Sequence, residues 1–79
     1  MTPAAKRVQS LDDYVVFVEF ENGENGSLDM KPFLNFGVFQ KIKDPLIFNQ
    51  VRVAFDTIEW PNGIDLDPDF VYMKCQKQD

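Results

Sequence analysis

The strongest structural signal in the chain is the segment Tyr14-Val15-Val16-Phe17-Val18-Glu19-Phe20-Glu21-Asn22-Gly23-Glu24. Its first seven residues are rich in β-branched and aromatic side chains, which predicts a strand. Apolar residues fall on both faces of that strand, so we expect a central strand that is covered on both sides for much of its length. Asn22-Gly23 predicts a hairpin with a two-residue type I′ turn, since both central residues of that turn take positive φ.

Other segments also have the composition of strands. Residues 7–10 precede the central strand, and residues 25–29 return from the hairpin, where Gly26 weakens the pairing and favours a position near the sheet edge. Val51, Val53 and Phe55 alternate with Arg52 and Ala54 and predict a strand over residues 50–55 with a buried face. After a reversal at residues 56–57, residues 58–60 form a short strand that pairs back. Together these segments predict a small, mainly antiparallel sheet of about five strands.

Short helices are expected where proline follows a capping residue. Pro32 suits the first position of a one-turn helix over residues 32–36 that ends at Gly37, and Asp44-Pro45 opens a second short turn over residues 46–49. Asp67-Pro68-Asp69 opens a C-terminal helix, because Asp67 caps it and Asp69 adds negative charge near its N-terminus. We therefore expect a single α+β domain over residues 1–79. The side chains of the last helix that face the sheet are expected to be Phe70, Met73 and Tyr72.

An apolar stripe runs through the region between the hairpin and the later strands. Its members recur every three residues, which predicts one shared face. Such a face can be a groove for a ligand or partner, or a helix face packed on the sheet, and we favour the packed face. The stripe consists of Phe33, Phe36, Phe39 and Ile42.

The composition excludes several functional classes. The 79 residues include one cysteine, Cys75, and no histidine, so the chain offers neither an intramolecular disulfide nor a usual ligand set for zinc, haem or an iron–sulfur cluster. Catalysis through histidine is excluded for the chain acting alone. No apolar run approaches the length of a membrane span, and residues 1–7 lack the apolar stretch of a signal peptide. We therefore expect a cytoplasmic protein without cofactors or membrane contact.

The charge balance favours a protein partner. Eight basic and 13 acidic residues give a formal net charge of −5, and the basic residues do not cluster, so direct nucleic-acid binding is not expected. An acidic domain attracts basic proteins, and we expect a small basic partner. A homodimer is kept as a further alternative, because a chain of this length has a small core and gains stability by covering apolar surface.

The densest polar cluster extends from Glu59 to Asp69 and contains the candidate site residues. Three alternate aspartates resemble the start of an EF-hand calcium loop, but Phe70 stands where that loop needs glycine and Gln76 where it needs glutamate. The aspartates can instead close a turn and cap the last helix. We expect no metal and no enzymatic activity, and we keep a small-ligand or metal-dependent site on this segment as the alternative. The candidate residues are Glu59, Trp60, Asn62, Asp65, Asp67 and Asp69.

Glu59 and Trp60 each allow two interpretations. A carboxyl group pressed against an indole has a raised pKa and can act as a general acid, but a domain of this size seldom encloses a substrate pocket. Trp60 is the first candidate for a binding hot spot if its ring is exposed. As a core anchor, with a turn at residues 61–63 behind it, Trp60 would have no such role, and this arrangement is favoured.

Several motifs occur in a recognisable order: Phe20-Glu21-Asn22-Gly23-Glu24, Leu28-Asp29-Met30, Pro32-Phe33-Leu34, Gly37-Val38-Phe39, Asp44-Pro45, and the block Trp60-Pro61-Asn62-Gly63-Ile64-Asp65-Leu66-Asp67-Pro68. Together they resemble a family of small prokaryotic domains of unknown function. The resemblance implies a compact α+β domain with a mainly antiparallel sheet, and it implies almost nothing about activity. Some relatives resemble the N-terminal half of longer proteins with a helix-turn-helix DNA-binding domain, and others resemble one member of a toxin–antitoxin gene pair.

The leading functional hypothesis is a non-catalytic protein–protein interaction or regulatory module. Its most specific form is an antitoxin-like partner of a small neighbouring protein. The small size, the acidity, the abundant aromatic residues and the missing catalytic groups motivate this hypothesis, and the family resemblance is a secondary argument.

Overall fold

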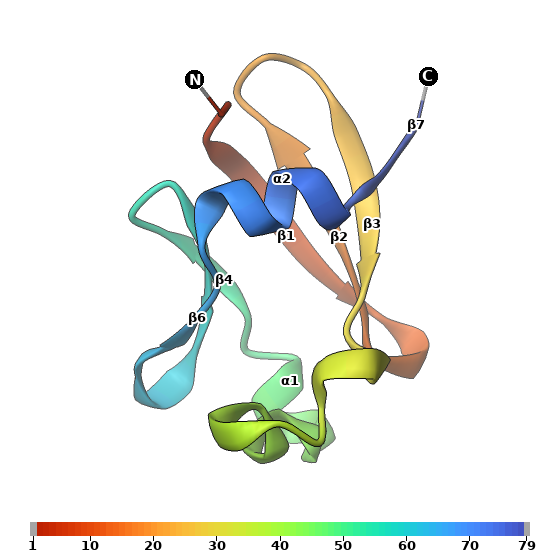
Figure 1. Ribbon diagram of the computed structural model, residues 1–79, viewed down its shortest axis with the longest axis vertical. Helices are drawn as coiled ribbons and strands as arrows, with labels where there is room; N and C mark the ends of the chain where they lie inside the picture. The colour runs from red at the N-terminus through yellow and green to blue at the C-terminus, as the bar shows by residue number, and fades with distance from the viewer. Residues whose placement is uncertain (1, 79) are drawn as a thin grey trace.

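Two antiparallel sheets form the framework of the molecule, and the computed structural model describes residues 2–78. The larger sheet has four strands in the order β1-β2-β3-β7, and the smaller has three in the order β4-β5-β6. In Figure 1 the larger sheet lies on the right, the smaller sheet lies on the left, and α2 runs from one to the other. The strands are β1 Ala5–Leu11, β2 Val15–Phe20, β3 Asn25–Asp29, β4 Arg52–Ala54, β5 Thr57–Trp60, β6 Ile64–Asp65 and β7 Gln76–Gln78.

The α+β class is confirmed, while the expectation of one sheet of about five strands is corrected to two sheets with seven strands among the described residues. The short strands β4, β5 and β6 pair among themselves, so they do not extend the first sheet. The predicted position of residues 25–29 near the sheet edge is confirmed, because β3 pairs with β2 on one side and, on the other, with β7, the outermost strand of the described sheet. β7 is a polar segment without the strand pattern, which is why the sequence did not indicate it.

The β2 strand lies at the centre of the larger sheet, between β1 and β3, as the sequence predicts. Val16, Val18 and Phe20 are buried on one face, and the residues between them are half-buried. The hairpin to β3 is present, but its turn is not type I′. Gly23 has a positive φ of 91° and donates its N–H to the Phe20 carbonyl at 3.0 Å, while Asn22 has no positive φ. A three-residue loop that ends in a left-handed glycine therefore replaces the predicted two-residue turn.

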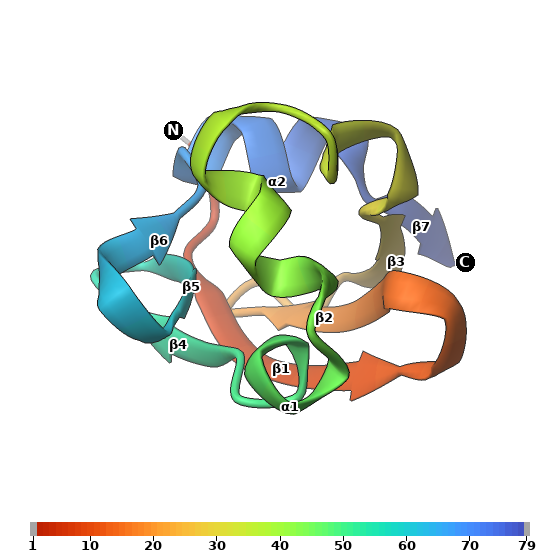
Figure 2. The same ribbon diagram turned by 90° about the horizontal axis from the view of Figure 1, so that it is seen from below.

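Short helices and 3₁₀ turns connect the strands. Figure 2, seen from below, shows α1 and η3 closing one end of the molecule, with α2 along one side of it and β1 and β2 along the other. None of the helices within residues 2–78 is long and apolar enough to cross a membrane. The helical segments are η1 Asp12–Tyr14, η2 Lys31–Phe33, η3 Gly37–Lys43, α1 Pro45–Phe48, η4 Pro61–Gly63 and α2 Pro68–Lys74.

Two of these helices begin at the predicted aspartate–proline signals. The Asp44 side chain accepts a hydrogen bond from the Leu46 N–H at 3.0 Å, and the Asp67 side chain accepts one from the Asp69 N–H at 2.8 Å. Each bond satisfies one of the backbone donors that a helix N-terminus leaves free. The capping predictions at residues 44 and 67 are confirmed.

One core fills the space between the sheets and α2. It contains most of the predicted inward residues, but Met73, Phe36 and Phe55 are exposed. Met73 is 76% exposed, because Val71 of α2 and Cys75 at its C-cap, one turn apart, occupy the inner face. The largest fully buried side chains are Trp60, Phe20, Phe48, Met30, Ile42, Ile58, Val16, Val18 and Val71.

The apolar stripe does not form one face. Ile42 is buried, Phe33 and Phe39 are half-buried, and Phe36 is 66% exposed. The cause is local: η2 and η3 are separate turns, and Phe36 between them is extended, with φ −108° and ψ 121°. An extended residue breaks the three-residue period, so its side chain leaves the common face.

The prediction of a buried Phe55 is also wrong. The strand ends at Ala54, and Phe55 and Asp56 form the two-residue turn between the paired residues Ala54 and Thr57. Both turn residues have positive φ, 51° and 68°, as a type I′ turn requires. The reversal therefore occurs one residue earlier than predicted, and Phe55 is 90% exposed at the tip of the hairpin.

Candidate functional site

Trp60 lies in the core and offers no contact surface. Trp60 is 1% exposed, and its indole N–H donates to the Phe48 carbonyl at 3.1 Å. The indole also packs against the Phe48 ring, with ring centroids 5.9 Å apart. A partner cannot reach a ring in this position without unfolding the domain. The prediction that Trp60 belongs to an interaction surface is therefore wrong. The favoured interpretation, in which Trp60 anchors the core, is confirmed.

Glu59 faces an arginine and does not press against the indole. Its carboxylate accepts hydrogen bonds from Arg52 Nε at 2.9 Å and Nη2 at 2.6 Å across the β4–β5 pair. Successive residues of a strand point to opposite faces, so Glu59 and Trp60 are directed apart. The geometry that would give Glu59 a general-acid role is not present.

The remaining candidates lie on the segment from η4 to α2. Asn62, with φ 72°, belongs to the three-residue connection between β5 and β6 and is exposed. Asp65 is an exposed residue of β6, Asp67 caps α2, and Asp69 accepts a hydrogen bond from the Thr2 hydroxyl. Within residues 2–78, no group of three or more carboxylate or thiol side chains is arranged to hold a metal ion.

A groove of about 280 Å³ brings together part of the acidic segment and part of the apolar stripe. It opens between the η2 and η3 turns on one side and the connection from β6 to α2 on the other. The rings of Phe33 and Phe70 meet edge to face, with centroids 5.3 Å apart at 75°. Its surface is almost wholly apolar, and the exposed residues Asp65 and Asp67 lie at its rim. The lining residues are Phe33, Phe39, Asp65, Leu66, Asp67 and Phe70.

Sequence reasoning identified most members of this groove without placing them together. Phe33 and Phe39 belonged to the predicted stripe, and Asp65 and Asp67 to the acidic segment. Phe70 was expected to face the sheet, whereas it is half-buried against Phe33. The grouping depends on packing between segments that are far apart in the chain, and no local pattern indicates it.

Polar links lie on the two elements, η2 and α2, from which the rings of Phe33 and Phe70 project. Lys31, at the start of η2, places its ammonium group 3.0 Å from the Asp29 carboxylate and 3.1 Å from the Asp13 carboxylate. Hydrogen bonds from the Lys31 backbone and side chain lower the pKa of Asp29, and the hydrogen bonds to Asp29 and Asp13 raise the pKa of Lys31. On α2, Tyr72 donates its hydroxyl to Glu24, and this bond raises the pKa of Tyr72.

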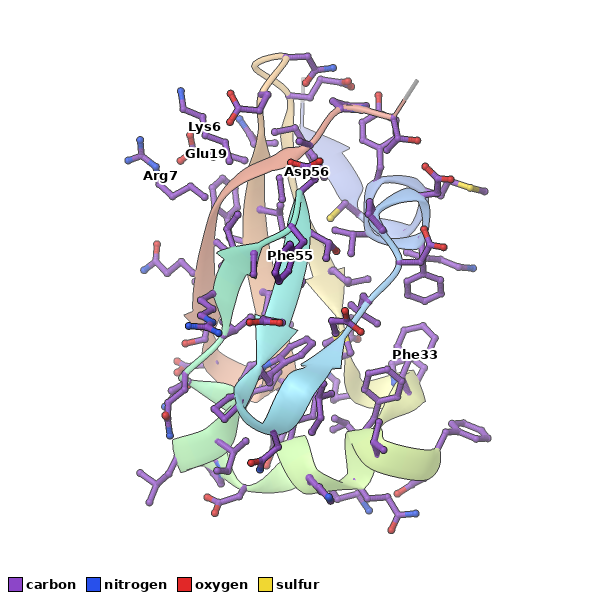
Figure 3. The ribbon with its side chains drawn as sticks, turned by 90° about the vertical axis from the view of Figure 1, so that its left-hand side faces the viewer. Lys6, Arg7, Glu19, Phe33, Phe55 and Asp56 are labelled. Carbon is purple, nitrogen blue, oxygen red and sulfur yellow. The ribbon has the colours of Figure 1, made fainter. Side chains whose placement is uncertain are left out.

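The tip of the β4–β5 hairpin is a second feature that the sequence did not indicate. Figure 3 shows Phe55 beside Asp56 at the tip, Lys6 and Arg7 extending from β1 on the side away from Phe55, and Phe33 on the far side of the segment between β6 and α2. The Asp56 carbonyl accepts a hydrogen bond from the Ala5 N–H at 2.9 Å, which ties the tip to β1. An exposed phenylalanine in the left-handed region is unusual, since asparagine and glycine are the residues preferred there.

Comparison with known proteins identifies one family. A family model described as "Protein of unknown function (DUF2442)" matches residues 5–77, which is nearly the whole chain. No curated protein and no solved structure matches the chain.

Proposed function

The chain belongs to the DUF2442 family of proteins of unknown function, and on that premise we propose that it is a non-catalytic protein-binding module. Its binding site is the groove between Phe33, Phe39 and Phe70. The partner segment inserts one apolar side chain there and places basic residues against Asp65 and Asp67 at the rim.

The groove itself is the observation that carries this proposal. At about 280 Å³ it is smaller than the roughly 300–1,000 Å³ of most small-molecule sites, and it has room for a single aromatic side chain. Aromatic walls favour an aromatic or aliphatic occupant, because rings pack edge to face as Phe33 and Phe70 already do. A small pocket with rigid aromatic walls is the kind of site that binds the anchor residue of a partner protein.

Charge supports a basic partner. The protein has a formal net charge of −5, and two exposed carboxylates stand at the rim of the groove. Long-range attraction of this kind speeds association and selects the orientation of the partner more than it strengthens the complex. A small basic protein fits this surface, and the finer form of the proposal, an antitoxin-like partner of a small neighbouring protein, rests on the family resemblance alone.

The alternative function is a small-ligand or metal-dependent site at Asp65 and Asp67, which line the same groove. One oxygen of Asp67 is already engaged in capping α2, which reduces what this carboxylate can offer an ion. Thermal unfolding with calcium, magnesium or manganese at millimolar concentrations separates the two functions. A rise in the unfolding midpoint with any of these ions would support the metal site, because binding to the folded state alone stabilises it.

Short synthetic peptides test the protein-binding proposal. We expect a peptide with one phenylalanine between lysines to shift the ring signals of Phe33, Phe39 and Phe70 in NMR titrations. Burial of one ring gives about 1.5–3 kcal/mol, which corresponds to a dissociation constant of roughly 6–80 mM, so the titration extends to peptide concentrations of tens of millimolar. Replacing the peptide phenylalanine by alanine, or the lysines by glutamates, should weaken binding.

A protein variant provides the matched control. Phe39→Ala removes one wall and should weaken peptide binding, whereas Leu46→Ala changes a residue of α1 that is 74% exposed and does not line the groove, and should have no effect. Equal binding of the phenylalanine and alanine peptides, or signal shifts confined to residues outside the groove, would contradict the proposal.

A further inference from the structure

We propose that the Phe55 tip of one molecule inserts into the groove of a second copy of this chain, so that the protein associates with itself through a tip and a groove that both lie on every molecule. The inference rests on the proposed function in one respect, namely that the groove binds an aromatic side chain. It adds the identity of an occupant, which is the protein itself.

The conformation of Phe55 is the first observation behind this inference. Its φ of 51° is unfavourable for a phenylalanine, and its ring is 90% exposed, so neither the local backbone nor the core explains its presence. Backbone strain combined with an exposed aromatic ring is a recurrent feature of binding loops, in which a turn holds an anchor side chain outward. Because the ring is exposed, it does not occupy the groove of its own molecule.

The size and chemistry of the groove provide the second observation. An apolar cavity of about 150 Å³ accepts benzene, so the open groove of about 280 Å³ is large enough for one phenyl side chain. Its walls carry the rings of Phe33 and Phe70, which can pack against an inserted ring edge to face. The groove and the tip therefore both present apolar surface, and the groove has the volume to hold one ring.

Charges of opposite sign lie near the two features. Lys6 and Arg7 follow Ala5, whose N–H donates to the Asp56 carbonyl of the tip, although Figure 3 shows both side chains extending away from Phe55, and Asp65 and Asp67 line the groove. Within the described part of the chain Lys6 forms no ion pair, and Arg7 has only the Glu19 carboxylate at 4.0 Å, an exposed contact that contributes little. Asp56 at the tip opposes this attraction, and the net charge of −5 makes copies repel at long range, so we expect reversible association that screening by salt assists.

Geometry decides how far the association proceeds. A pair of molecules that exchange their tips reciprocally forms a closed dimer, with a mass twice the 9.2 kDa of one chain. A head-to-tail arrangement, with one tip in one groove per contact, continues to larger species. Both arrangements require the same two surfaces.

Sedimentation equilibrium from micromolar to millimolar concentrations tests the inference. We expect concentration-dependent association of the wild-type protein, and Phe55→Gly should raise the dissociation constant about tenfold or more, as the loss of an anchor residue does. Phe39→Ala should weaken association from the groove side, and Leu46→Ala is the control at another exposed apolar residue, 74% exposed against 90% for Phe55. A wild-type protein that stays at 9.2 kDa throughout, or a Phe55→Gly variant that associates like the wild type, would overturn the inference.

Mixing two defective variants separates a direct contact from a merely structural effect. Phe55→Gly keeps an intact groove and Phe39→Ala keeps an intact tip, so a mixed pair retains one tip–groove contact and the mixture should associate more strongly than either variant alone. A mixture that associates no more strongly than the separate variants would refute insertion of the tip into the groove. These results are independent of the peptide titration. If the protein binds the peptide but stays monomeric, only the self-association is refuted. If the protein self-associates but does not bind the peptide, only the proposed basic partner is refuted.

Discussion

Replacing Phe55 by glycine and by alanine tests whether the β4–β5 turn is strained. Phe55 has φ 51°, and the left-handed conformation costs an L-residue about 1–2 kcal/mol. Alanine keeps this cost, whereas glycine avoids it but loses about 0.5–1 kcal/mol through its greater freedom in the unfolded chain. The balance of these terms predicts that Phe55→Gly is more stable than Phe55→Ala by about 0.5–1 kcal/mol.

Loss of the ring affects both variants equally. Phe55 is 90% exposed, so removing it sacrifices only about 20 Å² of buried apolar surface, or roughly 0.5 kcal/mol. For a domain of this size a difference of 1 kcal/mol moves the unfolding midpoint by about 4–8 °C, so we expect the glycine variant to melt about 2–8 °C above the alanine variant. Thermal and urea unfolding followed by circular dichroism, at concentrations low enough to avoid association, measure both quantities.

The same pair of substitutions at Phe36 serves as the control. Phe36 is exposed but has φ −108°, which every residue adopts without strain. There the order should reverse, with alanine more stable than glycine by about 0.5–1 kcal/mol. If alanine is also the more stable residue at position 55, the turn is not strained in solution and the argument from strain fails.

Three further substitutions test the core, a helix cap and an ion pair. Trp60→Phe should lower the free energy of unfolding by about 1–3 kcal/mol, because it removes the indole hydrogen bond to the Phe48 carbonyl, which keeps only the Val51 N–H at 3.3 Å, and leaves a cavity in the core; an unchanged urea midpoint would contradict the anchoring role. Asp67→Ala should cost about 0.5–2 kcal/mol in urea unfolding through loss of the α2 cap, and Asp67→Asn should cost much less. The hydrogen bonds from Lys31 lower the pKa of Asp29 from its ordinary value of 3.8. The ionised Asp29 carboxylate therefore stabilises the fold fully above about pH 3.8, and this stabilisation is lost as the pH falls through the folded-state pKa. Asp29→Asn should therefore flatten the acid side of a stability–pH profile, and an unaltered profile would show that the pairing is not maintained in solution.

The elements predicted from short segments are largely those that the structure contains. β2, β3 and the two capped helices follow from signals that act within a few residues: alternation along a strand, a glycine that tolerates positive φ, and an aspartate that caps the turn after it. The prediction that Asp67 caps the last helix is confirmed for the same reason, because the cap involves only neighbouring residues. Such signals act through the local backbone and need no knowledge of the rest of the chain.

The errors occur where a distant segment decides the outcome. Phe55 continues the alternation of β4 but lies in the turn, because the register Arg52↔Glu59 and Ala54↔Thr57 leaves only two residues to reverse the chain. The division into two sheets depends on which strands find partners, and β7 forms against β3 although its own sequence is polar. Strand pairing is a long-range interaction, so periodicity along the chain does not specify it.

The amino-acid sequence by itself determined the class of domain, its acidity, the absence of histidine, the central strand and the two aspartate-capped helix starts. The tertiary structure alone decided which residues are available to a partner: Trp60 is withdrawn into the core, Phe55 is held outward, and Phe33, Phe39 and Phe70 are brought together in one groove. The physical reason is that burial is a property of the packed molecule. Hydrophobic side chains at many positions compete for one small core, and only the three-dimensional arrangement shows which of them remain at the surface.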